Sequence, residues 1–174
     1  MTTWNLDKAH SEIEFKVRHM MISNVKGFFQ DFNISMSGDP EDITTASIRI
    51  AIASASINTK NEQRDQHLRS ADFFDSSSYP EITFDSTDIK KESDETYAIT
   101  GNLNIKGNVH PLVFSVEFGG IATDPWGNKK VGFAFSGKLN RGDFGLTWNA
   151  AVEAGGVMVG DEVKISGDIQ FILS

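Results

Sequence analysis

The stretch EIEFKVRH, residues 12–19, decides the fold class because apolar and polar side chains alternate along it. Ile13, Phe15 and Val17 share one parity, and the positions between them carry charged side chains. Successive side chains of a β-strand point to opposite faces of the sheet. The stretch therefore predicts a strand with one face on an apolar core and the other in water.

Seven further stretches repeat this alternation, which gives eight predicted strands. Polar segments rich in turn-forming residues separate several of them, such as SGDPED at 37–42 and TDPWGN at 123–128. Regularly spaced strands joined by polar turns are typical of an antiparallel sandwich or barrel. The apolar phase slips near Gly27, which predicts a bulge or bend there. The other seven stretches are 32–36, 48–52, 82–84, 97–105, 112–118, 131–135 and 163–171.

One segment breaks the strand pattern. KNEQRDQHLR, residues 60–69, contains no glycine, proline or β-branched residue, and Thr59 followed by Glu62 reads as a capping box. The sequence therefore predicts one short helix over about residues 60–69. Asp65 and Arg69 stand four positions apart on this helix and are expected to form an ion pair. A second segment, GGVMVGDE at 155–162, is expected to be a loop.

Polar side chains gather on the expected docked face of the helix and in the segment LNRGDFGLTW. Leu68 is the only large apolar side chain of the helix, Arg64 lies one turn before it, and His67 flanks the same face. Arg64, His67 and Arg141 are therefore candidates for binding the polar head of a ligand. The alternatives remain open: the first two would only brace the helix, and Arg141 would pack on an aromatic ring or pair with Asp143.

Composition and charge exclude several classes of function. The net charge of −8 argues against nucleic acid and anionic membrane surfaces as partners, because both are negative. The chain has no cysteine, so it carries no disulfide or thiolate chemistry. We find no apolar run of membrane-spanning length and no basic leader followed by an apolar stretch, and we expect a soluble, unexported, cytoplasmic protein without an integral membrane segment.

The histidines do not suggest a metal site, and no cofactor is expected. His10, His19, His67 and His110 never occur in an HxH or HxxxH arrangement. The sequence also lacks a GxSxG nucleophile elbow. By contrast, the chain holds 13 phenylalanines, which have no polar group. An excess of phenylalanine indicates a large dry core or a dry cavity.

Six blocks spread over nearly the whole chain carry a resemblance to a known family: WNLDKAHSEIEFKVRHM, VKGFFQDF, SINTKNEQRDQHLRSADFFDSSSYPEITFDS, GNLNIKGNVHPL, LNRGDFGLTW and VGDEVKISGDIQF. In this order they resemble the YceI-like, or polyisoprenoid-binding, proteins. The resemblance implies an elongated antiparallel barrel similar to the lipocalins, with an apolar bore that takes a long isoprenoid or similar amphiphilic chain. It also implies that many relatives are exported to the periplasm, whereas this sequence shows no export signal.

Together these observations predict one all-β domain over residues 1–174, an elongated eight-stranded antiparallel lipocalin-like barrel with one short helix. Its bore is narrow enough to suit a slender chain. The residues expected to line the bore are Phe15, Val17, Phe32, Ile34, Ile50, Phe84, Phe114, Phe133 and Phe135.

The predicted function is to bind a polyisoprenoid, an isoprenoid quinone or a similar lipid in the bore, for transport, storage or sequestration and without transforming it. The first alternative is an enzyme that acts on a lipid-like substrate in the barrel with Arg64, Asp65 and His67. The second is a protein-interaction module whose bore is filled by its own phenylalanines. A homodimer remains open.

Overall fold

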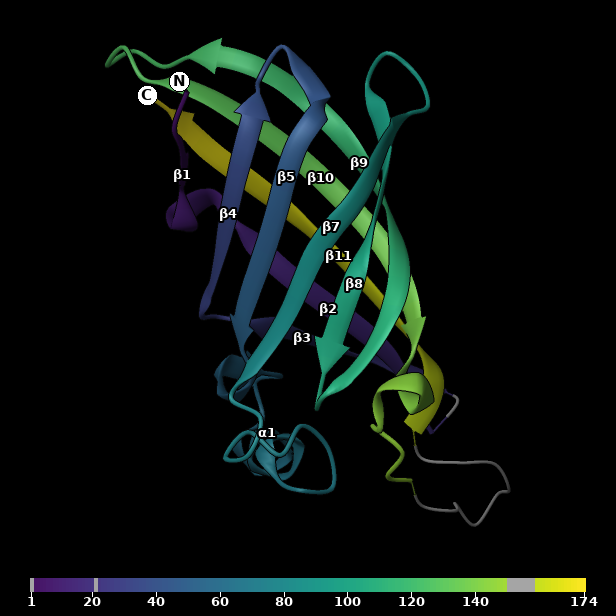
Figure 1. Ribbon diagram of the computed structural model, residues 1–174. Helices are drawn as coiled ribbons and strands as arrows, with labels where there is room; N and C mark the ends of the chain where they lie inside the picture. The colour runs from purple at the N-terminus through teal and green to yellow at the C-terminus, as the bar shows by residue number, and fades with distance from the viewer. Residues whose placement is uncertain (1, 21, 150–158) are drawn as a thin grey trace.

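The computed structural model describes residues 2–20, 22–149 and 159–174, which form one curled antiparallel sheet (Figure 1). Helix α1 (Glu62–Arg69) lies across one end of the curled sheet, and both termini lie at the other end. The strands are β1 (Trp4–Leu6), β2 (Glu12–His19), β3 (Ser23–Phe29), β4 (Phe32–Asp39), β5 (Asp42–Ala53), β6 (Ile57–Asn58), β7 (Glu81–Lys91), β8 (Thr96–Ile105), β9 (Asn108–Thr123), β10 (Lys129–Asn140) and β11 (Val159–Leu173).

The order of the strands is β4-β5-β7-β8-β9-β10-β11-β2-β3-β6, and β1 pairs with β11. Every predicted strand is found, and the all-β, antiparallel, barrel-like class is confirmed. The sheet has three strands more than predicted. Two of them, β1 and β6, have only three and two residues, too few to show an alternation. The third, β3, has Gly27 at the inward position between Val25 and Phe29, which interrupts the apolar alternation.

No bulge interrupts β3, so the bulge that was one of the two expectations near Gly27 is not found. Its ladder with β2 runs without a register shift from Glu14↔Phe28 to His19↔Ser23. Gly27 faces Phe15 directly, and a Cβ at Gly27 would collide with the ring of Phe15. The apolar phase changes after β3, where residues 30 and 31 lead the chain into β4, a strand that pairs with β5.

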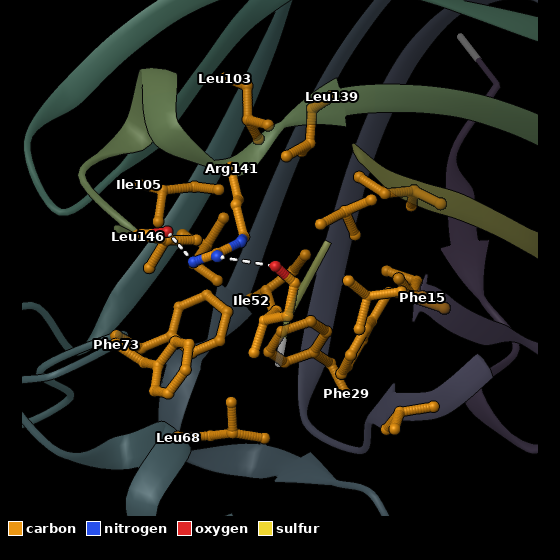
Figure 2. Close-up of a pocket in the computed structure, with 18 of the residues that line it drawn as sticks. Phe15, Phe29, Ile52, Leu68, Phe73, Leu103, Ile105, Leu139, Arg141 and Leu146 are labelled. Carbon is orange, nitrogen blue, oxygen red and sulfur yellow. Dashed lines mark hydrogen bonds between the residues drawn. The ribbon is translucent and has the colours of Figure 1, made fainter. Parts of the chain in front are cut away.

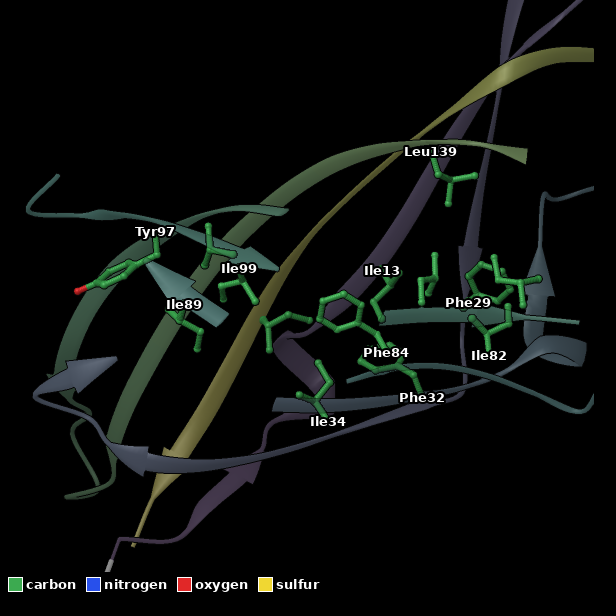
Figure 3. Close-up of a cluster of buried hydrophobic side chains, with 14 of the residues drawn as sticks. Ile13, Phe29, Phe32, Ile34, Ile82, Phe84, Ile89, Tyr97, Ile99 and Leu139 are labelled. Atoms are coloured by element: carbon green, nitrogen blue, oxygen red, sulfur yellow. The ribbon is translucent and has the colours of Figure 1, made fainter. Parts of the chain in front are cut away.

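The end of the barrel near the termini, called the terminal end, is filled by side chains. Trp4 packs on Phe133 and Phe171 at ring-centroid distances of 6.4 and 5.5 Å, and its Nε1 donates a hydrogen bond to the Gly38 carbonyl. The buried cluster continues through Ile34, Ile89, Tyr97 and Ile99 toward the middle of the barrel (Figure 3). This half of the bore is a packed core.

The first turn of α1 differs from the prediction. Asn61 caps the helix by accepting a hydrogen bond from the Arg64 backbone N–H at 3.1 Å, and Thr59 is not the cap. The carboxylate of Asp65 instead accepts hydrogen bonds from the backbone N–H and the hydroxyl of Thr59. Asp65 is therefore buried and does not pair with Arg69, which pairs with Glu62 at 3.3 Å.

The loop expected at 155–162 is partly a strand. Residues 159–162 begin β11, and Glu162 is the register partner of Asn140 in β10. The rest of that segment lies outside the described residues. Among the described residues, no helix combines the length and the apolar composition that a membrane crossing requires.

Candidate functional site

The half of the barrel on the side of α1, called the helix end, encloses a cavity of about 510 Å³. Its wall is formed by inward-facing apolar side chains of the sheet, and its floor by Leu68 of α1 together with Phe73 and Phe74 of the following turn. Figure 2 shows these side chains pointing toward a common space, with Leu139 and Leu103 on the opposite side from Leu68. The volume falls within the range of about 300–1,000 Å³ typical of small-molecule sites.

Phenylalanine and glycine pairs shape the wall of the cavity. Phe114 of β9 lies over Gly137 of β10, where a methyl group would come within 2.6 Å of the Phe114 ring. Phe84 lies in the same way over Gly101 of β8. A ring that occupies the space of a missing side chain lies against the wall and does not cross the bore. Gly27 with Phe15 and Gly167 with Phe135 repeat the arrangement.

The role of these glycines was missed by the sequence reasoning, although a signal was present. Gly101 and Gly167 stand at inward parity positions of predicted strands where an apolar residue would be expected, as Gly101 does between Ile99 and Leu103. A glycine inside a strand often marks a close approach by another group. Here the approaching group is an aromatic ring from the neighbouring strand.

The residues expected to line the bore fall into two groups. Phe15, Val17, Ile50, Phe84, Phe114 and Phe135 line the cavity. Phe32, Ile34 and Phe133 do not line it and belong to the hydrophobic core, with Phe133 packed on Trp4 at the terminal end. A ligand confined to the helix-end cavity would not contact these three side chains.

Arg64 lines the cavity and is also bound to the protein. Its Nε donates to the Thr59 hydroxyl at 2.8 Å, and its Nη2 donates to the Thr59 carbonyl at 2.9 Å. Thr59 therefore bridges Arg64 to the buried Asp65 carboxylate. Within the described residues Nη1 of Arg64 makes no hydrogen bond, so the side chain both braces α1 and keeps donors available.

His67 lies in an aromatic corner of the cavity. Its ring meets Phe73 and Trp148 edge to face at centroid distances of 5.1 and 4.7 Å, and its Nε2 lies 2.9 Å from an oxygen of Asp72. The hydroxyl of Ser70 donates to the backbone carbonyl of His67 and does not reach the ring. The described residues thus give His67 a carboxylate partner without a hydroxyl nucleophile.

Arg141 is buried and its donors are used within the protein. Nε donates to the Gly160 carbonyl at 2.8 Å, Nη1 to the carbonyls of Leu146 and Trp148, and Nη2 to that of Val159 at 3.3 Å. Figure 2 shows the guanidinium bonded to carbonyls at the edge of the cavity. Burial lowers the pKa of Arg141, and the nearby Asp161 carboxylate opposes that shift. Arg141 does not pair with Asp143, which was one of the alternatives; the carboxylate near its guanidinium is that of Asp161, 4.0 Å from Nη2.

The polar residues that the structure describes in the cavity wall carry hydrogen-bond donors, and none of them is acidic. Arg18 and His19 stand at the end of β2, and Arg64 and His67 stand on α1. Among the described residues, no aspartate or glutamate lines the cavity, although the whole chain has a net charge of −8. The helix end therefore favours an oxygen-bearing or anionic head group over a cationic one. Within the described residues, no group of three or more His, Cys, Asp or Glu side chains is placed to hold a metal ion.

Comparison with models of protein families shows to which family the chain belongs. The model of the YceI-like domain matches residues 4–171. The chain belongs to the YceI-like family. It is 42% identical over 172 residues to a UPF0312 protein of Staphylococcus epidermidis, covering 98% of each chain. This confirms the resemblance seen in the sequence blocks.

Solved structures of similar proteins agree with the fold of this YceI-like chain. The YCEI protein of Campylobacter jejuni matches with a TM-score of 0.78 and 34% identity, covering 99% of this chain and 98% of that one. A polyisoprenoid binding domain from Saccharophagus degradans matches with a TM-score of 0.74 and 13% identity, covering 99% of each chain. At that identity the second likeness concerns the fold alone.

Proposed function

We propose that the protein binds one long apolar or amphiphilic chain, of the polyisoprenoid class, in the helix-end cavity, and that it carries or sequesters this lipid without transforming it. The observation that supports this most is the cavity itself, whose wall and floor are almost entirely aliphatic and aromatic side chains. Membership of the YceI-like family, and a fold shared with a polyisoprenoid binding domain, favour a binding protein over an enzyme.

The energetics favour a long chain. Burial of a methylene group contributes about 0.8 kcal/mol, whereas association costs an estimated 4–15 kcal/mol, so roughly the first ten carbons only offset that cost. The apolar chain of the ligand would lie against the phenylalanine rings that pack on the glycines of the cavity wall. The polar head would lie toward α1, where Arg64 keeps donors available.

The proposal is tested by the dependence of affinity on chain length. We expect prenyl alcohols of increasing length to bind more tightly, by up to about fourfold for each added carbon that is buried. The increase should stop once the cavity is filled. Titration calorimetry with a series of prenyl alcohols measures this, and an affinity independent of chain length would contradict the proposal.

A further inference from the structure

A row of lysines crosses the outer face of four neighbouring strands. Lys138 of β10 is the register partner of Lys164 of β11, which pairs with Lys16 of β2, which pairs with Lys26 of β3. Each lysine is adjacent in sequence to a side chain that faces the bore, so all four point to the outer face of the barrel. These four residues are called the lysine row.

The lysine row is unfavourable for the isolated protein. Like charges placed directly opposite each other on neighbouring strands destabilise a sheet. Glu14 lies 3.8 Å from Lys26, and Glu162 stands two residues before Lys164 on β11. Among the described residues, Lys16, Lys138 and Lys164 have no carboxylate within ion-pair distance. An acidic chain that places four of its 16 cations in one row therefore presents a local positive surface.

The same wall ends in an exposed apolar tip. Strands β2 and β3 form a hairpin, and on its connection Met20 is 39% and Ile22 is 79% exposed. The hairpin runs to the helix end, beside the beginning of β11 (Figure 1). Arg18 and His19, which immediately precede the tip, line the cavity. The exposed apolar side chains thus lie next to residues that line the apolar cavity.

We propose that the lysine row and the tip of the β2–β3 hairpin dock the protein on an anionic lipid bilayer, with the helix end of the barrel toward the lipid. The two features have different natural partners: lysines are attracted to anionic head groups, and an exposed isoleucine and methionine enter the apolar layer below them. An acidic protein partner would account for the lysines. It would not account for the exposed apolar side chains beside the cavity.

The dimensions fit this orientation. At about 4.8 Å between strands the row is roughly 14 Å wide, and four residues at about 3.3 Å place Lys16 roughly 13 Å from the tip. A barrel that lies obliquely on the bilayer therefore places the lysine row at the lipid head groups and the hairpin tip deeper in the membrane. This docking departs from the expectation that the net charge of −8 disfavours anionic membranes. The local charge of the lysine row matters more than the net charge, because exposed charges more than about 8–10 Å away from it are largely screened at physiological salt.

Vesicle binding tests the docking independently of any ligand in the cavity. We expect the protein to co-sediment with vesicles made of equal parts of phosphatidylglycerol and phosphatidylcholine, to bind pure phosphatidylcholine weakly, and to be released by salt. The double variant Lys138→Gln and Lys164→Gln should lose roughly thirtyfold in affinity for the anionic vesicles, about fivefold for each lysine. Ile22→Ser should also weaken binding.

Two matched variants control for charge and for exposed apolar surface. Lys91→Gln with Lys129→Gln removes the same charge outside the row, and Trp126→Ser removes an apolar side chain that is 83% exposed on the turn at the opposite end. Both should bind as the wild type does. The proposal is overturned if the wild type binds neither vesicle, if both double lysine variants lose equal affinity, or if Trp126→Ser weakens binding as much as Ile22→Ser.

Discussion

Two arginines at the helix end differ in how much of their hydrogen-bonding capacity the protein itself uses. Arg141 donates to four backbone carbonyls, so its guanidinium joins the 3₁₀ turn Arg141–Phe144 to the start of β11. Arg64 donates to two oxygens of one residue, Thr59, and its Nη1 has no partner among the described residues. We therefore expect Arg64, and not Arg141, to meet the polar head of a ligand.

The substitution Arg64→Met separates binding from bracing. It keeps an apolar stem beside Leu68 and removes both the bonds to Thr59 and the free donors. We expect a lower melting temperature. We also expect the free energy of binding of a prenyl alcohol to weaken by about 1.5–3 kcal/mol, which is roughly a tenfold to hundredfold loss of affinity. The matching prenyl hydrocarbon should lose much less. Equal losses for both ligands would show that Arg64 only braces α1.

At the residue scale, the sequence predicted which face of the sheet a side chain occupies better than it predicted what that side chain packs against. Period-two alternation identified Phe15, Phe84 and Phe133 as inward-facing, since parity is a local property of a strand. Whether an inward ring lines a cavity or a packed core depends on what lies across the barrel. Phe133 meets Trp4, a residue 129 positions away in the chain, and local patterning carries no information on such a contact.

At the element scale, β10 contains two glycines in contrasting surroundings. A Cβ on Gly137 would lie 2.6 Å from the Phe114 ring, whereas a Cβ on Gly132 would have nothing within 4 Å. The substitution Gly137→Ala should therefore push Phe114 off the wall and into the cavity. We expect a stability loss of about 1–3 kcal/mol and weaker binding of long prenyl chains.

Gly132→Ala is the matched control, because it adds the same methyl group to the same strand. It should leave both the melting temperature and the affinity nearly unchanged. Thermal melts and titrations with one prenyl alcohol measure both effects. If the two alanine variants behave alike, the phenylalanine–glycine pairs do not keep the bore open.

The N-terminal segment is held to β10 by a charged network. Asp7 accepts from His10 at 2.8 Å and from Lys130 at 3.4 Å. Burial raises the pKa of Asp7, but the hydrogen bonds and charges of His10 and Lys130 outweigh it, so the pKa lies below its usual value. A lowered folded-state pKa means that the carboxylate stabilises the protein above the unfolded-state value of about 3.9 and loses this effect as the pH falls through the folded-state value.

The substitution Asp7→Asn tests this network. At neutral pH we expect the variant to be less stable than the wild type by about 1 kcal/mol. This difference should shrink as the pH falls below about 4, because the wild-type carboxyl becomes protonated. Urea unfolding of both proteins over a pH series measures the difference. A gap that stays constant down to pH about 2 would argue against a role for the Asp7 charge.

The elements missed by the sequence share physical causes. Strands β1 and β6 are too short for a periodic signal, and their pairing is set by distant partners, β11 and β3. The helix was found close to its true bounds, but its cap was assigned to Thr59, whose side chain is instead used by Arg64 and Asp65. Capping motifs describe local possibilities, and here tertiary hydrogen bonds decided between them.

At the scale of the whole molecule, the barrel is divided into a packed half and a hollow half. The terminal end holds Trp4 and the rings around it, and the helix end holds the cavity and its donors. Of the functions considered from sequence, a bore filled throughout by its own side chains does not fit a cavity of about 510 Å³. Composition predicted a dry interior but could not place it, because placement depends on how the strands are paired.

The central claim, that this cavity holds one long-chain lipid, is tested most directly by what the protein carries. Protein isolated from its own cells would be extracted with organic solvent, and the extract analysed by mass spectrometry and quantified against protein. We predict one predominant lipid with a long apolar chain, at close to one molecule per protein chain, and its loss in a variant such as Gly137→Leu that fills the cavity. An extract without lipid, from a protein that also takes up no added prenyl lipid, would contradict the account.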